Sequence, residues 1–238
     1  MNHVELLGSI IKNELKYTPN GTAILELTVG GRQDGRAYYQ RTTLFNKIAE
    51  IFAEAPVGMP IYLTGRLQQD RWQTKEGQTR SAIKTIVDQI RALDGVTTME
   101  DDRGQAIVEH GRNRVLMAGN TTRDAETKEL QKGNVVVTSL ALNSKRKGEE
   151  RTDYIDVSSF NHTSGQGGIQ SARKGDGLIV QGVLSTRSWE TDDGSRRYKT
   201  EVVADSVMLT TRVEDAQPTA PVNAQVEEEF PPESDLPF

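Results

Sequence analysis

The 238-residue sequence predicts an all-β fold in which one small β-barrel occurs twice in tandem, followed by a disordered acidic tail. The first observation is an internal repeat, and the second is the β-rich pattern of each copy, broken by glycine-containing turns. The third is a change after Arg212, where strand-forming residues give way to proline and acid. We expect barrels at residues 1–94 and 113–212, a linker at 95–112 and a tail at 213–238.

The repeat links short segments across the whole body of the chain. "VELLG" (Val4–Gly8) matches "VLMAG" (Val115–Gly119), and "YQRTTLFN" (Tyr39–Asn46) matches "YIDVSSFN" (Tyr154–Asn161). Near the end of each copy the spacing is constant at 117 residues, and the matched residues are Trp72, Thr74, Gly77, Arg80 and Asp88 with Trp189, Thr191, Gly194, Arg197 and Asp205. Two copies of one domain explain this pattern.

The first copy is expected to contain five strands and one helix. The strands are rich in Val, Ile, Leu, Thr and Tyr, are bounded by turn signals, and span His3–Ile11, Ala23–Val29, Tyr38–Leu44, Met59–Leu67 and Ser81–Ala92. Between the third and fourth strands, "NKIAEIFAE" places Ile48, Ile51 and Phe52 on one helical face, with Asn46 as the N-cap. This order is that of an OB-fold, a five-stranded barrel that binds oligonucleotides.

The second copy departs from the first at the helix. "HTSGQGGIQSARKGD" (His162–Asp176) contains three glycines before Lys174, and each costs about 1 kcal/mol relative to alanine in a helix interior. The sequence therefore predicts a shortened helix or a loop. The linker segment Asp94–Arg112 is charged and punctuated by glycine, and a short β segment is possible at Gln105–Glu109.

Composition narrows the classes of function. The chain has no cysteine, so disulfides, thiolate nucleophiles and cysteine-bound zinc are excluded. No stretch approaches 18 apolar residues, and "MNHVELLGSI" lacks the pattern of a secretory signal, so we expect a cytoplasmic protein. The HExxH and GxxxxGK[ST] motifs are missing and the three histidines are scattered. We therefore expect no enzyme, no cofactor and no metal site.

Charge is distributed unevenly along the chain. The net charge is −5, yet Val213–Phe238 alone holds seven acids and no Lys or Arg, which leaves 29 basic and 27 acidic residues in the body. A mildly basic body with an acidic tail is typical of nucleic-acid binding or of an interaction tail. A well-solvated body with a solubilising tail is the alternative.

Each copy places a tryptophan on a hairpin rich in cations. "RWQTKEGQTR" (Arg71–Arg80) and "SWETDDGSRRYKTE" (Ser188–Glu201) would join the fourth and fifth strands through acid–Gly turns. Unpaired bases stack on aromatic rings while Lys and Arg neutralise phosphates, so Trp72 and Trp189 are expected to stack on single-stranded nucleic acid. The alternative is that each indole belongs to the core. The expected phosphate-binding cations of the hairpins are Arg71, Lys75, Arg80, Lys84, Arg187, Arg196, Arg197 and Lys199.

The third strands carry further aromatic residues. Tyr39, Arg41, Thr43 and Phe45 alternate and therefore share one face; Tyr154, Asp156 and Ser158 line the matching face, with a shift needed to bring in Phe160. We expect Tyr39, Phe45, Tyr154 and Phe160 to stack on bases and Arg41 to bind phosphate, although a core position for the aromatics is the alternative. The loops Gly30–Arg36 and Asn143–Arg151 add Arg32, Arg36, Lys145 and Arg146.

The last residues, "EEEFPPESDLPF", place apolar side chains beside acids, and the terminal Phe238 adds its own carboxylate to an aromatic ring. Such an end fits a partner pocket with an apolar floor and a basic rim. The tip "DLPF" (Asp235–Phe238), together with "KYTPNG", "FNKIAE", "TRD", "RKGD" and "GRL", resembles the bacterial single-stranded DNA-binding proteins. The duplicated barrel resembles their two-OB Deinococcus–Thermus type.

This resemblance implies sequence-independent binding of single-stranded DNA, a homodimer that brings together four OB-folds, and association with the nucleoid. It further implies that Asp235, Leu236, Pro237 and Phe238 recruit replication, recombination and repair proteins. Asp156 stands where the first copy has Arg41, so the two barrels are not expected to bind DNA equally. An RNA-binding module remains an alternative, since stacking is indifferent to the sugar, as does an adaptor whose tail does the main work.

Overall fold

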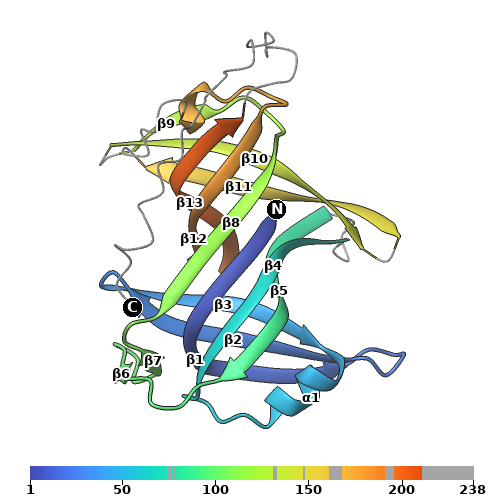
Figure 1. Ribbon diagram of the computed structural model, residues 1–238, viewed down its shortest axis with the longest axis vertical. Helices are drawn as coiled ribbons and strands as arrows, with labels where there is room; N and C mark the ends of the chain where they lie inside the picture. The colour runs from blue at the N-terminus through green and yellow to red at the C-terminus, as the bar shows by residue number, and fades with distance from the viewer. Residues whose placement is uncertain are drawn as a thin grey trace, which may run out of the picture.

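The computed structural model describes residues 1–73, 77, 79–130, 133–146, 148–160, 168–190 and 196–210. They form two β-barrels that lie end to end, with β1 and β8 side by side where the barrels meet (Figure 1). The prediction of two tandem OB-folds is confirmed. Among the described residues, the structure contains no helix of the length and apolarity required to cross a bilayer.

The first barrel contains β1 (Asn2–Tyr17), β2 (Ala23–Gln33), β3 (Arg36–Phe45), α1 (Asn46–Ala53), β4 (Pro60–Gln73) and β5 (Thr79–Ala92). β1 pairs with both β2 and β4, and β2 pairs with β3. The barrel closes where β3 runs parallel to β5, and β5 pairs with β4 along its whole length. All five expected strands are present, and β4 and β5 extend beyond the barrel as the arms of a hairpin.

The second barrel repeats this order with β8 (Arg112–Thr121), β9 (Glu126–Leu130), β10 (Gly133–Arg146), β11 (Glu149–Phe160), β12 (Gly177–Glu190) and β13 (Arg196–Thr210). β8 pairs with β10 and β12, and β11 closes the barrel through a parallel pairing with β13. The first strand is interrupted after Thr121, so β9 forms a separate arm that pairs with β10.

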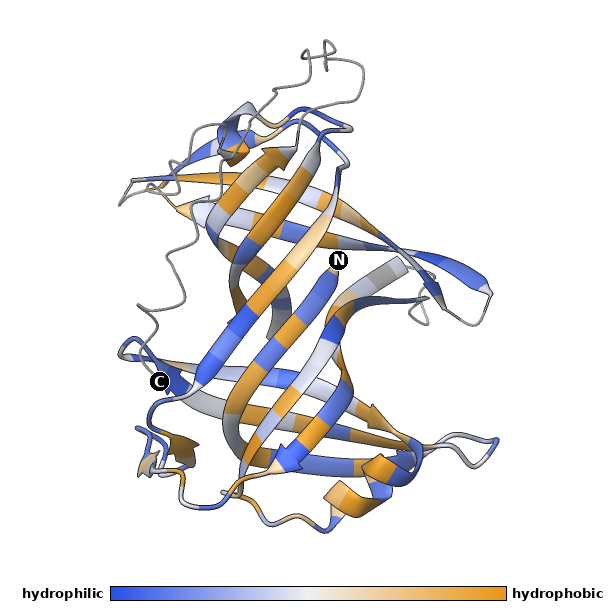
Figure 2. Cartoon of the chain, viewed as in Figure 1, coloured by the Kyte–Doolittle hydropathy of each residue, from blue (hydrophilic) through white to orange (hydrophobic). Residues whose placement is uncertain are grey.

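Alternation along each strand fills the two barrels with aliphatic side chains. In β2, Ala23, Leu25, Leu27 and Val29 are buried while the residues between them are half-buried. Figure 2 shows the same alternation of hydrophobic and hydrophilic residues along most strands. Burial of these side chains on one face is the main favourable contribution to folding of such a sheet.

The expected face of the helix α1 is wrong by one residue. Ala49 and Phe52 are buried, whereas Ile51 is 58% exposed and Ile48 also faces solvent. The small side chain of Ala49 lets this short helix approach the barrel closely, so the face that contains Ala49 turns inward. The expected N-cap is also wrong, because Phe45 holds that position without a side-chain cap and Asn46 is the first helical residue, with a φ of 59°.

The counterpart of α1 in the second barrel is reduced, as the glycines of that segment predict. Its described part holds only one turn of 3-10 helix, η1 (Ile169–Ser171), and residues 161–167 lie outside the described part. The expected linker forms a small hairpin from β6 (Thr98–Glu100) and β7 (Ala106–Val108). β7 adds to the edge of β2 through the pair Gly31 and Val108.

The two barrels are joined by one continuous sheet. Residues Asn2–Leu7 of β1 pair antiparallel with Arg112–Met117 of β8. The side chain of Glu5 accepts hydrogen bonds from Arg112 across this seam at 2.9 Å and from Tyr62 at 3.0 Å. Burial alone would raise the pKa of Glu5, but these two hydrogen bonds outweigh it, and the pKa lies below its ordinary value.

Candidate nucleic-acid interface

Trp72 does not belong to the core. It lies near the end of β4, opposite Arg80 in the ladder with β5, and 46% of its surface is exposed. The β4–β5 arms continue beyond the barrel as a two-stranded ribbon, which leaves no barrel interior for the indole to enter. An exposed tryptophan on a ribbon offers its ring to a ligand.

The second hairpin has the same backbone register. Trp189 lies opposite Arg197 in the ladder between β12 and β13, as Trp72 lies opposite Arg80. The side chains of Trp189, Arg80, Arg146, Arg196 and Arg197 lie outside the described part of the structure, as do Lys75 and the whole tip at 235–238. Their roles stay predictions.

Several predicted phosphate-binding cations already have carboxylate partners. Lys84 pairs with Asp70 at 2.8 Å in the first hairpin, and Arg187 pairs with Glu201 at 2.8 Å in the second. Lys199 pairs with Asp156 at 2.7 Å, and Lys145 pairs with Glu150 at 3.4 Å. The pair of Lys145 with Glu150 is exposed and contributes roughly 0–1 kcal/mol, so a phosphate could displace this carboxylate at little cost. Glu201 is buried, so Arg187 is held more firmly by its partner.

Arg41 and Arg71 lie instead against aromatic rings. The guanidinium of Arg41 lies 4.7 Å from the ring centre of Tyr198, and that of Arg71 lies 5.0 Å from the ring centre of Tyr154. These distances are those of cation–π contacts. Among the described residues neither arginine has a carboxylate partner, so both keep an uncompensated charge at the surface.

The outer face of β3 holds the predicted residues of the first barrel. Arg41 and Phe45 are exposed, Tyr39 is half-buried, and Thr43 is buried. The hydroxyl of Tyr39 donates to Asp101 of the linker, and Arg103 lies 5.8 Å from its ring centre. Burial and the negative charge of Asp101 raise the pKa of Tyr39 to about 12. The linker therefore covers part of this face.

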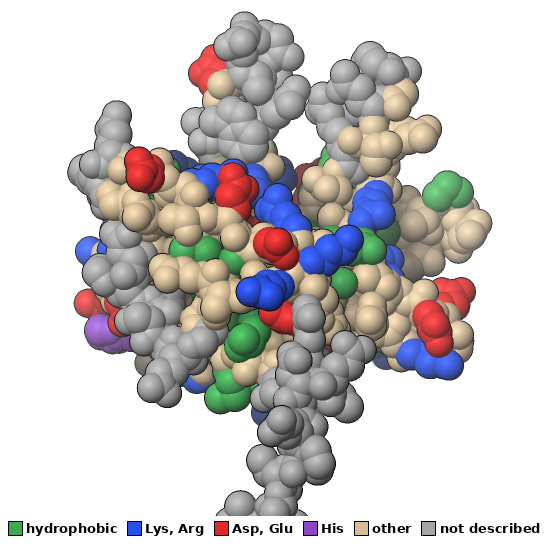
Figure 3. Space-filling view, turned by 90° about the horizontal axis from the view of Figure 1, so that it is seen from above, with side chains coloured by type: hydrophobic (Ala, Val, Ile, Leu, Met, Phe, Trp, Pro, Cys, Tyr) green, Lys and Arg blue, Asp and Glu red, His purple; other side chains and the backbone are tan. Residues whose placement is uncertain are grey.

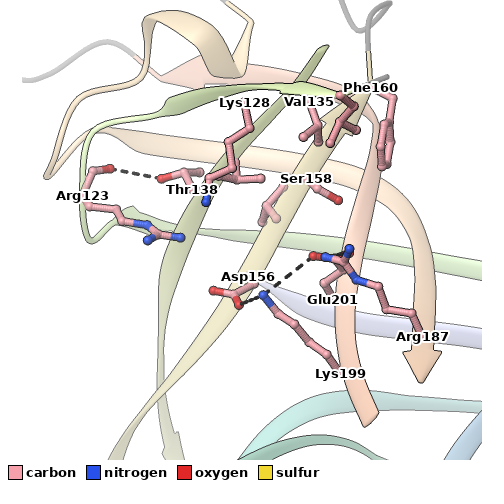
Figure 4. Close-up of a pocket in the computed structure, with 13 residues that line it drawn as sticks. Arg123, Lys128, Val135, Thr138, Asp156, Ser158, Phe160, Arg187, Lys199 and Glu201 are labelled. Carbon is pink, nitrogen blue, oxygen red and sulfur yellow. Dashed lines mark hydrogen bonds and ion pairs between the residues drawn. The ribbon is translucent and has the colours of Figure 1, made fainter. Parts of the chain in front are cut away.

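The matching face of β11 forms the floor of a groove of about 290 Å³ in the second barrel. Phe160 and Ser158 lie on this floor, and Arg123, Lys128, Arg187 and Lys199 surround it (Figure 4). Phe160 shares the face with Asp156 and Ser158 without the shift that the sequence suggested. Asp156 and Glu201 also line the groove, where they pair with Lys199 and Arg187. The aromatic ring with cations around it is suited to a stacked base and its phosphates.

The end of the second barrel presents basic and apolar side chains together. Figure 3, seen from the end of the second barrel, shows Lys and Arg gathered near the centre, with hydrophobic side chains beside them and a few acids between.

The turn between β2 and β3, which carries the predicted cations Arg32 and Arg36, is the tight pair Asp34-Gly35, both with positive φ. Arg36 is exposed at this turn, whereas Arg32 donates to the backbone oxygen of Gly35 and to the sulfur of Met99.

Sequence reasoning missed four residues of this surface, namely Tyr198, Arg103, Arg123 and Lys128. Tyr198 has Ser81 as its counterpart at the spacing of 117, so the search for matching pairs passed over it. Lys128 follows Lys16 at a spacing of 112, close to that of the repeat, and Arg123 lies in the "TRD" segment, so either signal could have identified the groove. The contact of Arg103 with Tyr39 joins residues 64 positions apart, so it could not be predicted from a local sequence pattern.

A chain of two closed five-stranded barrels, each with exposed aromatic and basic side chains on its third strand or its hairpin, is a tandem OB-fold protein. The chain belongs to the Single-strand binding protein family, whose model matches residues 1–93 and 112–210.

Relatives that align over most of this chain support this assignment. The chain is 33% identical to a single-stranded DNA-binding protein of Thermus aquaticus, over 100% of this chain and 98% of the relative. It is 32% identical to one of Deinococcus radiodurans, over 89% of this chain and 76% of the relative. The solved structure of the wild-type Thermus aquaticus protein superposes with a TM-score of 0.69 at 28% identity, covering 89% of this chain and 94% of that one.

Proposed function

We propose that this chain binds single-stranded DNA without reading its sequence, protects it, and presents it to other proteins. The observation that carries this proposal is the exposed Trp72 on a ribbon next to Arg71, together with the aromatic faces of β3 and β11. Flat rings stack on any base, and cations neutralise any phosphate, so such a surface is indifferent to base order. Family membership supports the same ligand.

A fluorescence titration tests this proposal directly. The emission of Trp72 and Trp189 is followed while oligo-dT of about 30 nucleotides is added at several salt concentrations. We expect quenching, with an apparent affinity that falls as salt rises because counterions are released from the phosphates. Equal affinity for duplex DNA, or tighter binding of an RNA of the same length, would contradict the proposed ligand.

We further propose that the tip Asp235–Phe238 recruits other proteins of DNA replication, recombination and repair. The apolar side chains beside acids and a terminal carboxylate support this role. Deletion of Glu233–Phe238 separates the two activities: single-stranded DNA binding is expected to survive or to tighten slightly, since an acidic competitor is removed, while capture of partners is lost. Loss of DNA binding with partner capture retained would contradict this division.

The assembly is proposed to be a homodimer, with barrels at 1–94 and 113–212 of each chain. The continuous pairing of β1 with β8 makes the two barrels of one chain a single body with one broad outer sheet surface, which is suited to packing against a second copy. Mass measurement in solution, with and without an oligonucleotide, checks this. A monomer at micromolar concentration would contradict it.

A further inference from the structure

We infer that the two places where a hairpin of one barrel meets the third strand of the other are composite binding sites for unpaired nucleotides, and that single-stranded DNA passes between the barrels over them. The first site consists of Arg71 and Tyr154, and the second consists of Arg41 and Tyr198. We call them the junction sites. This inference rests on the proposed function, because it specifies where the strand runs.

Each junction site takes its two members from different barrels. Arg71 lies on the β4–β5 hairpin of the first barrel, and its guanidinium covers one side of Tyr154 on β11 of the second. Tyr198 lies on the β12–β13 hairpin of the second barrel and is covered by Arg41 on β3 of the first. The same two residue types thus meet twice with their roles exchanged, although Tyr198 has a serine counterpart, Ser81, in the repeat.

Both tyrosines remain accessible to a ligand despite their contact with arginine. Tyr198 remains 52% exposed and Tyr154 remains 37% exposed, so a large part of each ring is open to solvent. An exposed ring face takes a stacked base of any type. The arginine beside it keeps its full charge, since among the described residues it has no carboxylate partner, and is therefore available to the phosphate of an adjacent nucleotide.

The arginine–tyrosine contacts are not needed to hold the barrels together. At the first junction the backbone N–H of Gln69 donates to Asp153 at 2.9 Å, and Arg151 donates to the backbone oxygen of Gln69. At the second, Gln40 donates to the backbone oxygen of Leu184 at 2.8 Å. The pairing of β1 with β8 adds a further connection. These hydrogen bonds, most of them between buried or half-buried groups, connect the barrels, which leaves the exposed arginine–tyrosine pairs for a ligand.

Each junction site adjoins the third-strand face of one barrel. Tyr154 shares its strand face with Asp156 and Phe160, which line the groove, whereas Arg71 and Trp72 are consecutive in β4 and present opposite faces of the ribbon. A strand that stacks on Tyr154 beside Arg71 therefore continues along this face of β11 into the groove of the second barrel. At the second junction site, Arg41 shares the outer face of β3 with Phe45, so a strand that stacks on Tyr198 beside Arg41 continues along the third strand of the first barrel.

The test measures affinity and salt dependence with labelled oligo-dT of two lengths, about 8 and about 30 nucleotides, given that one OB-fold covers roughly 4–16. For the longer oligonucleotide, Tyr198→Leu and Tyr154→Leu are each expected to weaken binding about 5- to 100-fold. Tyr198→Phe, which keeps the ring, recovers most of that loss. Arg41→Gln and Arg71→Gln are each expected to reduce the salt slope by about 1. The shorter oligonucleotide is affected less, because it occupies one barrel.

The matched control is Lys47→Gln, which removes one exposed cation from α1 at the far end of the first barrel (Figure 1). The junction sites are overturned, while the proposed function stands, if the wild-type chain binds DNA, both Tyr→Leu variants match this control within twofold in affinity, and both Arg→Gln variants keep the salt slope of the control. A wild-type chain that binds no single strand overturns both.

A measurement on the wild-type chain covers the case in which a variant fails to fold. An oligonucleotide carrying 5-iododeoxyuridine is irradiated in complex with the protein, and the adducts are located by mass spectrometry. Adducts at Tyr154 and Tyr198 are expected. Adducts confined to Trp72, Trp189 and the two phenylalanines of the third strands would overturn the inference.

Discussion

At the scale of single residues, the surface of this protein repeatedly pairs an arginine with an aromatic ring. Arg41, Arg71 and Arg103 each lie over a tyrosine. Planar guanidinium groups stack on rings and still bind phosphate, which a lysine does less well. Trp72 differs, because it lies on the ribbon beyond the barrel with 46% of its surface exposed, and it is the most direct probe of the proposed function among the described aromatics.

Replacement of Trp72 by alanine should weaken binding of oligo-dT by about 1–3 kcal/mol, since one stacked base loses its ring. Trp72→Phe should lose less, because a smaller ring remains. Fluorescence anisotropy of a labelled oligonucleotide measures both. Met208→Ala is the control, as Met208 is also largely exposed but lies on β13 near the end of that strand. Equal affinities for Trp72→Ala and this control would refute a stacking role.

Tyr39 makes a contribution to the free energy of unfolding that is lost at alkaline pH. Its pKa is raised to about 12 in the folded chain from an ordinary value of 10.0, because burial and the Asp101 carboxylate disfavour the phenolate. The unfolded chain therefore loses this proton first, so the contribution is complete below pH 10 and disappears as the pH rises toward 12.

We expect the free energy of unfolding of the wild-type chain to fall between pH 10 and 12, and to fall less steeply in Tyr39→Phe. Denaturant titrations at several pH values measure this. Part of the slope should remain in the variant, since burial also raises the pKa of Tyr38. Identical slopes in the two proteins would show that Asp101 does not hold the Tyr39 hydroxyl in solution.

At the scale of elements, the repeated hairpin is bent by the same device in both barrels. The ladders of β4 with β5 and of β12 with β13 shift register at Gly65 and Gly182, which are 117 residues apart. A Cβ at either glycine would overlap a backbone oxygen, that of Ile86 or that of Val203. The bulge that bends each strand therefore requires glycine at this position.

Gly65→Ala and Gly182→Ala should each lower the free energy of unfolding by about 1–3 kcal/mol, because the added methyl group has no space. Urea titration followed by circular dichroism measures the loss. Gln89→Ala serves as the control, since Gln89 is exposed and lies opposite Thr64, next to the first bulge. A variant as stable as this control would mean that the backbone at the bulge can move aside.

Strands could be predicted from the sequence, because their alternation and turn residues lie within short segments that also occur in both copies. Contacts between the barrels could not be predicted, because they join distant segments. All five strands of the first copy were found because alternation and turn residues lie within each strand. The inward face of α1 was wrong, since an eight-residue helix carries too few residues for its pattern to distinguish Ile48 and Ile51 from Ala49. Tyr198 was missed because its partner, Arg41, lies in the other barrel.

The two hairpins keep an ion pair at equivalent positions although the residues that form it differ between the copies. Asp70 pairs with Lys84 in the first, and Arg187 pairs with Glu201 at the positions 117 residues later. The acid and the base have exchanged strands, yet both pairs keep a separation of 2.8 Å. The repeat preserves the interaction rather than the residue, so matching identical residues underestimates the similarity of the copies.

At the scale of the whole molecule, the two barrels form one body because polar groups of both meet in a buried seam. The backbone oxygen of Leu184 accepts hydrogen bonds from Gln40 of the first barrel and from Asn113 of the second, each at 2.8 Å. Asn113 also accepts from the N–H of Leu184 at 3.0 Å, and Gln40 accepts from Thr186 at 3.0 Å. Buried groups that satisfy one another in this way fix the relative position of the parts that carry them.

Gln40→Met tests this coupling, because methionine has a similar shape but makes neither hydrogen bond. Two hydrogen bonds at a net 0.5–1.5 kcal/mol each imply a loss of about 1–3 kcal/mol in the free energy of unfolding. Since the sheet continues from β1 to β8, we expect the wild-type chain to unfold in a single transition in which circular dichroism and tryptophan emission change together. The variant should shift that whole transition, whereas Gln89→Met, at an exposed position, should leave it in place. Two separate transitions, with only the first moved by Gln40→Met, would mean that the barrels fold independently and that a bound strand must itself hold them in register.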